Sequence, residues 1–224
     1  MFAIGHAATA LVIKRAYPSV PMMPILISVQ AMEFTWVALN YLGIERTTTE
    51  SIVRSVADIH LEYMPWSHSV ATPVVAGLAV WLVVEKGFGR AALGRAVGIG
   101  IVSHLVLDLL MHGHDIALWP GLASPKLGSG LYDAPFAAFI VESVYGIVCW
   151  AIYGGNWGLL ALIVIGNLAN LPFLSPAITW PLDFLAGRPT LIVTLILAQI
   201  VVTLVLVGLL ARRPEEGAKV KSSI

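Results

Sequence analysis

Residues 100–120 hold the densest group of metal-binding side-chain types in the chain. His104, Asp108 and His112 are spaced four residues apart, and Asp115 follows a glycine that is expected to end the helix. Because an α-helix turns once in about 3.6 residues, the first three side chains lie on one face. An imidazole and a carboxylate four residues apart can chelate one metal ion. The alternative is a buried His–Asp hydrogen bond that ties two helices together.

Within this stretch, His112 has a different expected role from His104. A helical rise of about 1.5 Å per residue places the two residues about 12 Å apart, which is too far to share one ion. We therefore expect His112 to serve a second ion or the entrance of the site. Glu33, Asp108 and Asp115 are the candidate catalytic residues, because each carboxylate could act as a general base.

The composition indicates the class of protein that must position these residues. Of the 224 residues, 58% are hydrophobic and only 12% are charged. Soluble domains carry about twice that share of charge, and several apolar runs here approach the roughly 20 residues that cross a bilayer. We therefore predict an all-α, polytopic transmembrane helical bundle in contact with the lipid bilayer. A net charge of zero with scattered basic residues argues against nucleic-acid binding.

About six apolar segments are predicted to cross the membrane, with a surface amphipathic helix after the first of them. The surface helix, residues 48–62, is predicted from Thr47 and Glu50, which have capping-box spacing. Residues 1–211 are predicted to form a single helical membrane domain and residues 212–224 a polar tail. A short amphipathic or half-spanning helix is expected at 2–16, and the crossing segments at 22–43, 69–85, 94–112, 134–153, 156–174 and 190–211.

The basic residues predict an orientation in the membrane. If the predicted segments alternate, nine of the thirteen Lys and Arg residues fall on one side, and the positive-inside rule places that side, with the C-terminal tail, in the cytoplasm. Counted from the opposite face, Glu33, His104 and Glu142 lie at a depth of about 12–15 Å. A charge in lipid costs roughly 3 kcal/mol or more. These side chains are therefore expected to face one another inside the bundle.

The other polar residues each have a simpler alternative role. Glu33 is a metal ligand, a proton relay or a protonated structural acid. His6 on its short apolar helix could be only hydrogen-bonded, and His68 could be an interfacial residue beside Tyr63 and Trp66. The amides expected to tie helices together are those of Asn167, Asn170 and Gln199.

Four segments carry a resemblance to a known family: GHAATALVIKR, EYMPWSHS, SHLVLDLLMHGHDIALWPG and KLGSGLYDAP. Over most of residues 1–145 the chain resembles bacterial multi-pass proteins described as predicted membrane-bound metal-dependent hydrolases, whose metal-site pattern is similar to that of zinc-dependent phospholipase C. The chain departs from the family pattern where Glu33 replaces an Asp and where GLYD replaces a GLW-like stretch. The resemblance implies the bacterial inner membrane as the location. The metal ligands that it implies are His6, Glu33, His68, His104 and Asp108.

A site made of histidines and carboxylates suits a divalent ion, with zinc first and manganese or iron as alternatives. The resulting hypothesis is a metal-dependent hydrolase that acts on a lipid or phosphoester substrate. One alternative is a small transporter in which the buried ionisable residues relay protons or ions. Another is a membrane protein without catalytic activity. The metal content of the purified protein separates the first hypothesis from the last.

Overall fold

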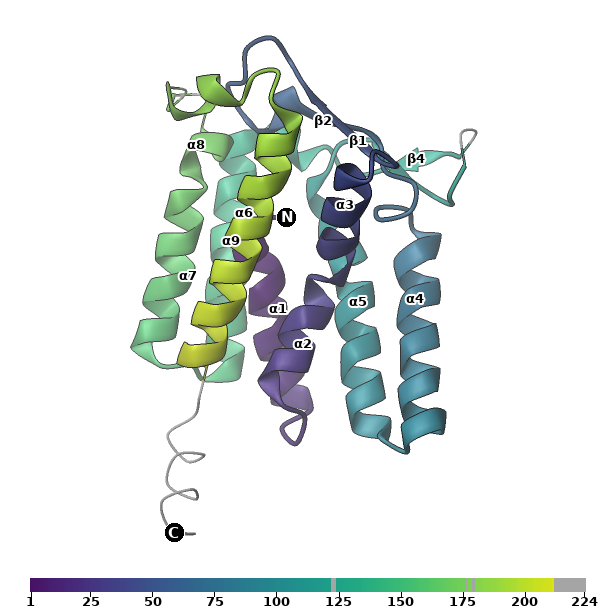
Figure 1. Cartoon of the computed structure of the whole chain (residues 1–224). Coiled ribbons are helices and arrows are strands. Elements are labelled where there is room, and N and C mark those ends of the chain that lie inside the picture. Colours follow the sequence, from purple (N-terminus) through teal and green to yellow (C-terminus); the bar gives the residue numbers. More distant parts are fainter. Residues whose placement is uncertain (122–123, 176, 179, 212–224) are drawn as a thin grey trace.

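The computed structural model describes residues 1–121, 124–175, 177–178 and 180–211, and this part of the chain is mostly helical (Figure 1). The all-α prediction is therefore confirmed in its main feature. The α-helices are α1 (Ala3–Ala16), α2 (Met22–Val29), α3 (Ala31–Tyr41), α4 (Ala71–Leu82), α5 (Ala91–Met111), α6 (Pro135–Tyr153), α7 (Trp157–Ala169), α8 (Leu171–Leu174) and α9 (Pro189–Leu210). The short helical turns are η1 (Val56–Asp58), η2 (Val83–Gly87), η3 (Leu131–Asp133) and η4 (Trp180–Leu185). The strands are β1 (Arg46–Thr49), β2 (Ile59–Tyr63), β3 (Ile116–Ala117) and β4 (Lys126–Leu127).

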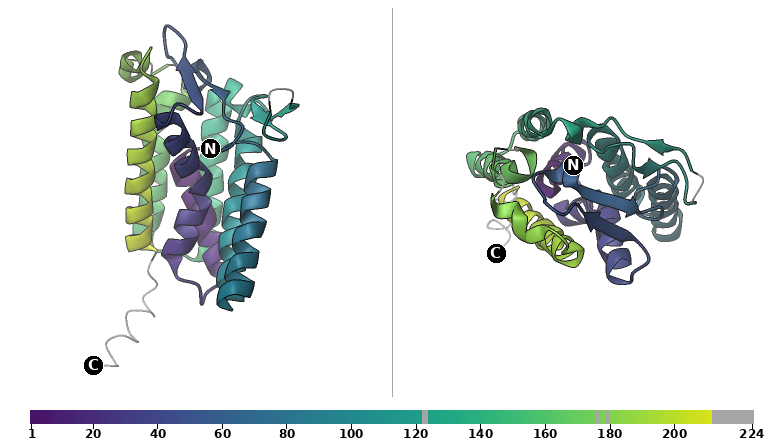
Figure 2. Two further views of the ribbon diagram at one scale, coloured as in Figure 1. Left: turned by 45° about the vertical axis from the view of Figure 1, so that its right-hand side comes forward. Right: turned by 90° about the horizontal axis from the view of Figure 1, so that it is seen from above.

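Helix α1 occupies the centre of the bundle, with other helices on several sides of it (Figure 2). Its sequence is apolar around the whole circumference, and a helix of that kind has to be buried. Ala7, Ala10 and Leu11 are completely buried against α2, α7 and α9. Of the two alternatives predicted for 2–16, the amphipathic helix is wrong, because α1 is buried on all sides up to the exposed Arg15 and Ala16 at its end, whereas the half-spanning helix stays a prediction.

The predicted crossing at 22–43 is broken into α2 and α3, which meet at an angle of 51°. The hydroxyl of Ser28 donates to the carbonyl of Ile25 at 2.7 Å, a contact that commonly bends helices. At the break, the side chain of Gln30 donates to the carbonyl of Ala3 on α1. The break places Glu33 in the first turn of α3, where it faces the interior of the bundle.

The predicted surface helix at 48–62 is wrong, since this segment forms an antiparallel hairpin of β1 and β2. The run of β-branched threonines in β1 favours a strand over a helix. Thr47 donates to the side chain of Asn40 and caps no helix. The capping box of this region lies further on, between Ser55 and Asp58, and it closes only the single turn η1.

The loop between α5 and α6 contains the short strand pair of β3 and β4 and the turn η3. Its backbone is tied to the segment before α4, because the amide of Val70 donates to Ala117 at 2.8 Å and that of Ala71 donates to Leu118. These bonds fix the residues next to His68 against the end of α5. The loop is thus part of the frame of the site.

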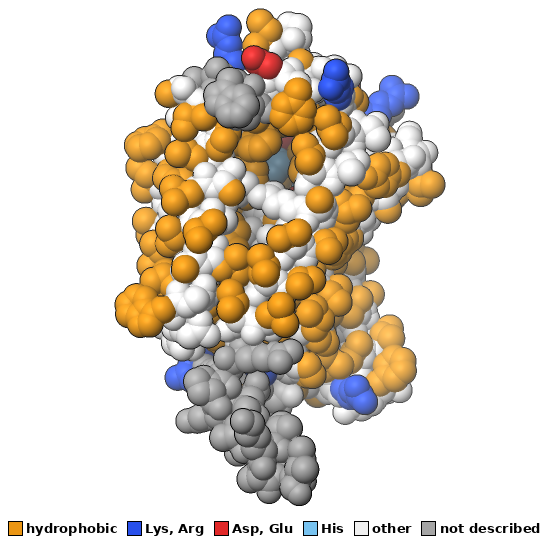
Figure 3. Space-filling view, turned by 60° about the vertical axis from the view of Figure 1, so that its left-hand side comes forward, with side chains coloured by type: hydrophobic (Ala, Val, Ile, Leu, Met, Phe, Trp, Pro, Cys, Tyr) orange, Lys and Arg blue, Asp and Glu red, His pale blue; other side chains and the backbone are white. Residues whose placement is uncertain are grey.

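In the described residues, α5, α6 and α9 are long and apolar enough to cross a membrane, and the bent pair of α2 and α3 adds a fourth span if it counts as one. The structure therefore supports three to four spans, fewer than the six predicted. Helix α4 (12 residues) continues directly into the π-helical segment η2 (5 residues), a stretch of 17 in all, and α7 has 13, so both fall short of the roughly 20 that a crossing needs. In side view, hydrophobic side chains cover the middle of the molecule and Lys and Arg lie toward its ends (Figure 3). The predicted tail, residues 212–224, lies outside the described residues.

Candidate metal centre

Four of the six histidines of the chain converge in the upper half of the bundle. His6 comes from α1, His68 from the segment before α4, His104 from the middle of α5, and His112 from the C-terminal end of α5. All four are at most 9% exposed. The other two histidines, His60 and His114, are exposed. Burial therefore separates the clustered histidines from the solvated ones.

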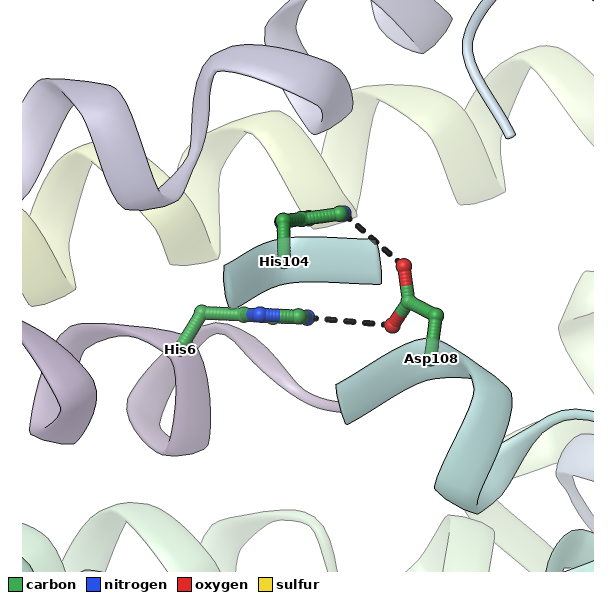
Figure 4. A group of neighbouring side chains, drawn as sticks. All are labelled: His6, His104 and Asp108. Atoms are coloured by element: carbon green, nitrogen blue, oxygen red, sulfur yellow. Dashed lines mark ion pairs between the residues drawn. The ribbon is translucent and has the colours of Figure 1, made fainter. Parts of the chain in front are cut away.

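The first potential ligand group is His6, His104 and Asp108, whose ligand atoms all lie within 4.8 Å of one another. Nε2 of His104 is 3.0 Å from Oδ2 of Asp108, and Nε2 of His6 is 3.3 Å from Oδ1. The two imidazole rings are stacked in parallel, 3.9 Å apart, and both point toward the carboxylate (Figure 4). The predicted pair at positions 104 and 108 thus gains a third member from α1.

The second group is Glu33, His68 and His104, again with all ligand atoms within 4.8 Å. Oε1 of Glu33 is 3.8 Å from Nε2 of His68 and 3.9 Å from Nε2 of His104. Nε2 of His68 also lies 3.6 Å from Oδ2 of Asp108. Because His104 belongs to both groups, they form one cluster of five residues. These are the same five ligands that the family resemblance implies.

The tautomer of His104 is set by its surroundings. Its Nδ1 is 2.9 Å from the carbonyl oxygen of Val29, which can only accept a hydrogen bond. Nδ1 must therefore carry the proton, and in the neutral ring Nε2 has a free lone pair. That lone pair faces Glu33 and Asp108. A metal-binding histidine is commonly oriented through its other nitrogen in this way.

His68 is set in the same tautomer by a relay through Ser67 and Glu45. The hydroxyl of Ser67 donates to Oε2 of Glu45 at 2.5 Å and lies 2.8 Å from Nδ1 of His68. Because the single hydroxyl proton goes to the carboxylate, Nδ1 of the neutral ring must donate to Ser67 Oγ. Nε2 of His68 then has its lone pair toward Glu33. Glu45 is only 2% exposed and also accepts from the backbone amides of Trp66 and Ser67.

Several polar atoms of the cluster are buried without a well-formed hydrogen bond in the described residues, although two of them, Nε2 of His104 and Oδ2 of Asp108, face each other at 3.0 Å. They are both ring nitrogens of His6, Nε2 of His104 and Oδ2 of Asp108. A buried polar atom left unpaired costs about 1–3 kcal/mol, so a protein keeps several of them together only for a reason. A divalent ion would satisfy nitrogen and oxygen lone pairs together. The residues present therefore fit a metal ion.

A second polar cluster lies directly beside the first. The amino group of Met1 is 2.9 Å from Oδ1 of Asp108. Glu142 accepts from the amide of Phe2 at 3.3 Å and from the hydroxyl of Tyr132 at 3.2 Å. Glu142 is completely buried, as its predicted depth requires, but it belongs to neither ligand group.

The remaining predicted site residues lie at the edge of the cluster. Nε2 of His112 is 3.9 Å from Oδ1 of Asp108, and Nδ1 is 3.4 Å from Oδ2 of Asp115. His112 is in neither ligand group. The two residues line the cavity beside the cluster, and the role predicted for His112, at a second ion or at the entrance, stays a prediction.

The three candidate carboxylate bases differ in their access to this cavity. The side chain of Glu33 is 15% exposed and that of Asp115 is 30% exposed, and both line the cavity. The side chain of Asp108 is 1% exposed and lies behind the histidines. Asp108 is therefore placed to bind a metal ion, whereas the carboxylates of Glu33 and Asp115 can also meet a substrate in the cavity.

The cavity has a volume of about 780 Å³, and most of its wall is apolar. Its polar floor includes Glu33, His68 and His112. Sites for small organic ligands commonly fall between about 300 and 1,000 Å³ with this mixture of apolar wall and few polar groups. In side view, a histidine is visible at the bottom of a hollow that hydrophobic side chains surround (Figure 3).

The electrostatic environment of His68 favours its charged form when no metal is bound. Burial alone lowers the pKa of His68, but the neighbouring carboxylates of Glu33 and Asp108 outweigh it and raise the pKa to about 8. The cluster thus attracts positive charge. A cationic metal ion benefits from the same two carboxylates.

The amides expected to tie helices together do so in part. Gln199 on α9 donates to Asn170, at the end of α7, at 2.5 Å. Asn167 instead donates to the carbonyl of Ile163 within its own helix. The structure also shows two supporting residues that we did not predict, Glu45 and Ser67. The sequence gives a signal only for Ser67, which directly precedes His68. Glu45 gives none, because it is more than twenty residues away.

Comparisons with protein-family models, with curated proteins and with solved structures found no match to this chain.

Proposed function

We propose that the protein binds a divalent metal ion, zinc ahead of manganese or iron, through His6, Glu33, His68, His104 and Asp108. The observation that carries this proposal is the group of unpaired buried nitrogen and oxygen atoms that point at one another from α1 and α5. The hydrogen bonds on the far side of His104 and His68 support it, because they leave Nε2 of both rings available. Histidine and carboxylate donors suit these three metals.

We further propose that the protein is a metal-dependent hydrolase of a lipid or phosphoester substrate. When bound, a divalent ion supplies Lewis acidity, which activates water near neutral pH and polarises a phosphoryl or acyl oxygen. Glu33 lines the cavity and can accept a proton from an attacking water. His112 can deliver a proton to a leaving group, since Asp115 orients its ring through Nδ1. The cavity beside the cluster gives a substrate room to reach these groups.

Membership of the membrane-bound metal-dependent hydrolase family, with a location in the bacterial inner membrane and a cytoplasmic C-terminus, is part of the same proposal. The five ligands implied by the resemblance are the five residues of the cluster, which supports it. Three to four apolar helices are consistent with a multi-pass protein.

The test is metal analysis of the detergent-purified protein by inductively coupled plasma mass spectrometry, followed by hydrolysis assays. We expect bound metal in the unchanged protein and a loss of most of it in His104→Ala. His60→Ala is the matched control, because His60 is 44% exposed and its ion pair in the described part of the chain is with Glu50, outside the cluster. Hydrolysis of bis(p-nitrophenyl) phosphate should depend on the added metal. A folded protein that contains no metal and takes up none would refute the metal site.

The transport alternative has less support from the packing. Toward the other end of the bundle from the cluster, the described residues form an apolar core of α1, α2, α7 and α9, which includes Leu11, Leu26 and Leu204. A pathway for protons or ions needs polar groups or water along its length. The cluster therefore fits a site that is reached from one side.

A further inference from the structure

The cavity beside the metal cluster has two chemically different rims. Its exposed lining residues divide between the hairpin and loop region on one side and the apolar outer surface of the helices on the other. The metal cluster lies between the two. A molecule that fills such a cavity has to be polar at one end and apolar at the other.

The apolar rim is formed by Ala169 at the end of α7, Phe184 on η4 and Leu195 on α9. Leu195 is 42% exposed and Phe184 is 48% exposed, although both line the cavity. The wall continues inward through Phe173 and Ile196 toward Glu33. This rim therefore opens through the side of the bundle, in agreement with the hollow among hydrophobic side chains in Figure 3.

The surface around this rim is apolar as well. Ile165 and Leu168 on α7 are 63% and 51% exposed, and Val202 on α9 is 56% exposed. Helix α9 is among those long and apolar enough to cross a membrane. If α9 spans the bilayer, the material outside the rim is the hydrocarbon of lipids.

The polar rim lies under the β1–β2 hairpin and beside the loop after α5. Its exposed members are His60, Glu62, His114, Lys126 and Asp133. This rim carries charges of both signs, which suits a zwitterionic polar group better than a second hydrocarbon chain. It also gives a water-soluble product a way out that does not cross the apolar wall.

We propose that the cavity binds a membrane phospholipid that enters sideways between α9 and the end of α7, with its hydrocarbon part on the apolar wall and its head group toward Lys126. This inference rests on the proposed hydrolase function. It goes further by naming the substrate class, because the phosphoester of such a lipid lies between its apolar and its polar part, as the cluster lies between the two rims. Hydrolysis adds the hydroxyl of water to phosphorus and its proton to the departing alcohol oxygen. The head-group side then leaves through the polar rim, and the lipid side returns to the bilayer.

The test blocks the apolar rim with a large side chain. Leu195→Trp and Ala169→Trp narrow it from opposite sides, and Val202→Trp is the control because Val202 is exposed on α9 and does not line the cavity. The full-length protein is loaded with zinc and assayed on dioleoyl phosphatidylcholine in mixed micelles and on bis(p-nitrophenyl) phosphate. We expect the ratio of lipid to soluble-substrate hydrolysis to fall roughly tenfold or more in both rim variants. The ratio should stay unchanged in Val202→Trp.

An unchanged ratio in both rim variants, with a thermal melt showing that they are folded, would overturn the proposed entry. If the unchanged protein hydrolyses neither substrate, the hydrolase proposal fails. The proposed lipid site is then tested separately, by measuring lipid binding. Native mass spectrometry with added dioleoyl phosphatidylcholine measures this binding. Retention of lipid by the unchanged protein and its loss in both rim variants supports the cavity as a lipid site. Equal retention in all four proteins overturns it.

Discussion

Glu45 offers the sharpest test of how the metal cluster is held together. It is more than twenty residues from His68 in the sequence and touches none of the proposed ligands, yet it determines where the hydroxyl proton of Ser67 points. In Glu45→Gln, Oε1 must still accept from the backbone amides of Trp66 and Ser67. The NH2 group of the new glutamine side chain therefore faces the hydroxyl of Ser67. The NH2 group of a side-chain amide donates and does not accept. Ser67 must then turn its proton toward Nδ1 of His68.

This change moves the proton of the neutral His68 ring to Nε2, the atom that faces Glu33. A metal can bind there only after the new hydrogen bond between Ser67 and His68 is broken. Loss of a residue that orients a metal ligand typically costs about 10–100-fold in affinity, which corresponds to roughly 1.4–2.8 kcal/mol. Ser67→Ala removes the relay and leaves both tautomers available. Its loss of affinity should therefore be smaller than that of Glu45→Gln.

The assay is competition for zinc between the detergent-purified variants and a chromophoric chelator. Glu50→Gln serves as the control, because the same change is made in the neighbouring hairpin at a side chain that is 58% exposed. A thermal melt in the absence of metal shows whether each variant is folded. The tautomer argument is refuted if folded Glu45→Gln binds zinc as tightly as the unchanged protein, or if Ser67→Ala loses more affinity than Glu45→Gln.

Three further predictions concern packing, metal and ligand chemistry. Gly100→Ala should lower the free energy of unfolding by about 1–3 kcal/mol, because a Cβ there overlaps Ser28 Oγ and lies 2.9 Å from Ser28 Cβ. Gly87→Ala is the control, since a Cβ at that position meets open space, and a thermal melt should show no change for it. Zinc at about 100 times its Kd should stabilise the protein by about 2.7 kcal/mol, which corresponds to a rise of roughly 5–10 °C in Tm for a chain of this size. A chelator should reverse this rise. An equal rise in His104→Ala would contradict binding at the cluster. Glu33→Asp should retain metal, since it keeps the carboxylate, whereas Glu33→Gln should lose most of it; equal metal content in the two variants would argue against Glu33 as a ligand.

The sequence was sufficient to predict the elements whose signals are local. The segments expected at 134–153 and 190–211 are found as Pro135–Tyr153 and Pro189–Leu210, because each has proline in its first turn and an unbroken apolar run. The pair His104 and Asp108 was also predictable, since one helix fixes both positions. The fivefold cluster required more. His6 and His68 entered as ligands through the family resemblance, because nothing in their own segments separates a ligand from a buried structural histidine.

The remaining differences come from contacts between segments that are distant in sequence. The polar segment at 46–63 contains a plausible helix cap, so its local pattern predicted a helix. It forms a hairpin because the pairing of its two strands decides its structure. The break between α2 and α3 depends on Gln30 reaching α1. Glu45 was not predicted as a supporting residue, because its role depends on the hydrogen bonds that it accepts from residues 66 and 67. In each case the deciding partner is a side chain or strand that the local pattern does not identify.

Three of the five cluster residues lie where helices begin. His6 lies near the start of α1, Glu33 in the first turn of α3, and His68 just before α4. Helix N-termini present free amide groups and a partial positive charge, which stabilise carboxylates and would also favour an anionic phosphoester. The starts of α2, α5 and α7 lie at the other end of the bundle (Figure 1), where the helices pack around the apolar core of α1. The cluster therefore combines three residues from helix starts with two from the C-terminal half of α5, and the packed half of the bundle provides the stability that tolerates these buried ionisable side chains.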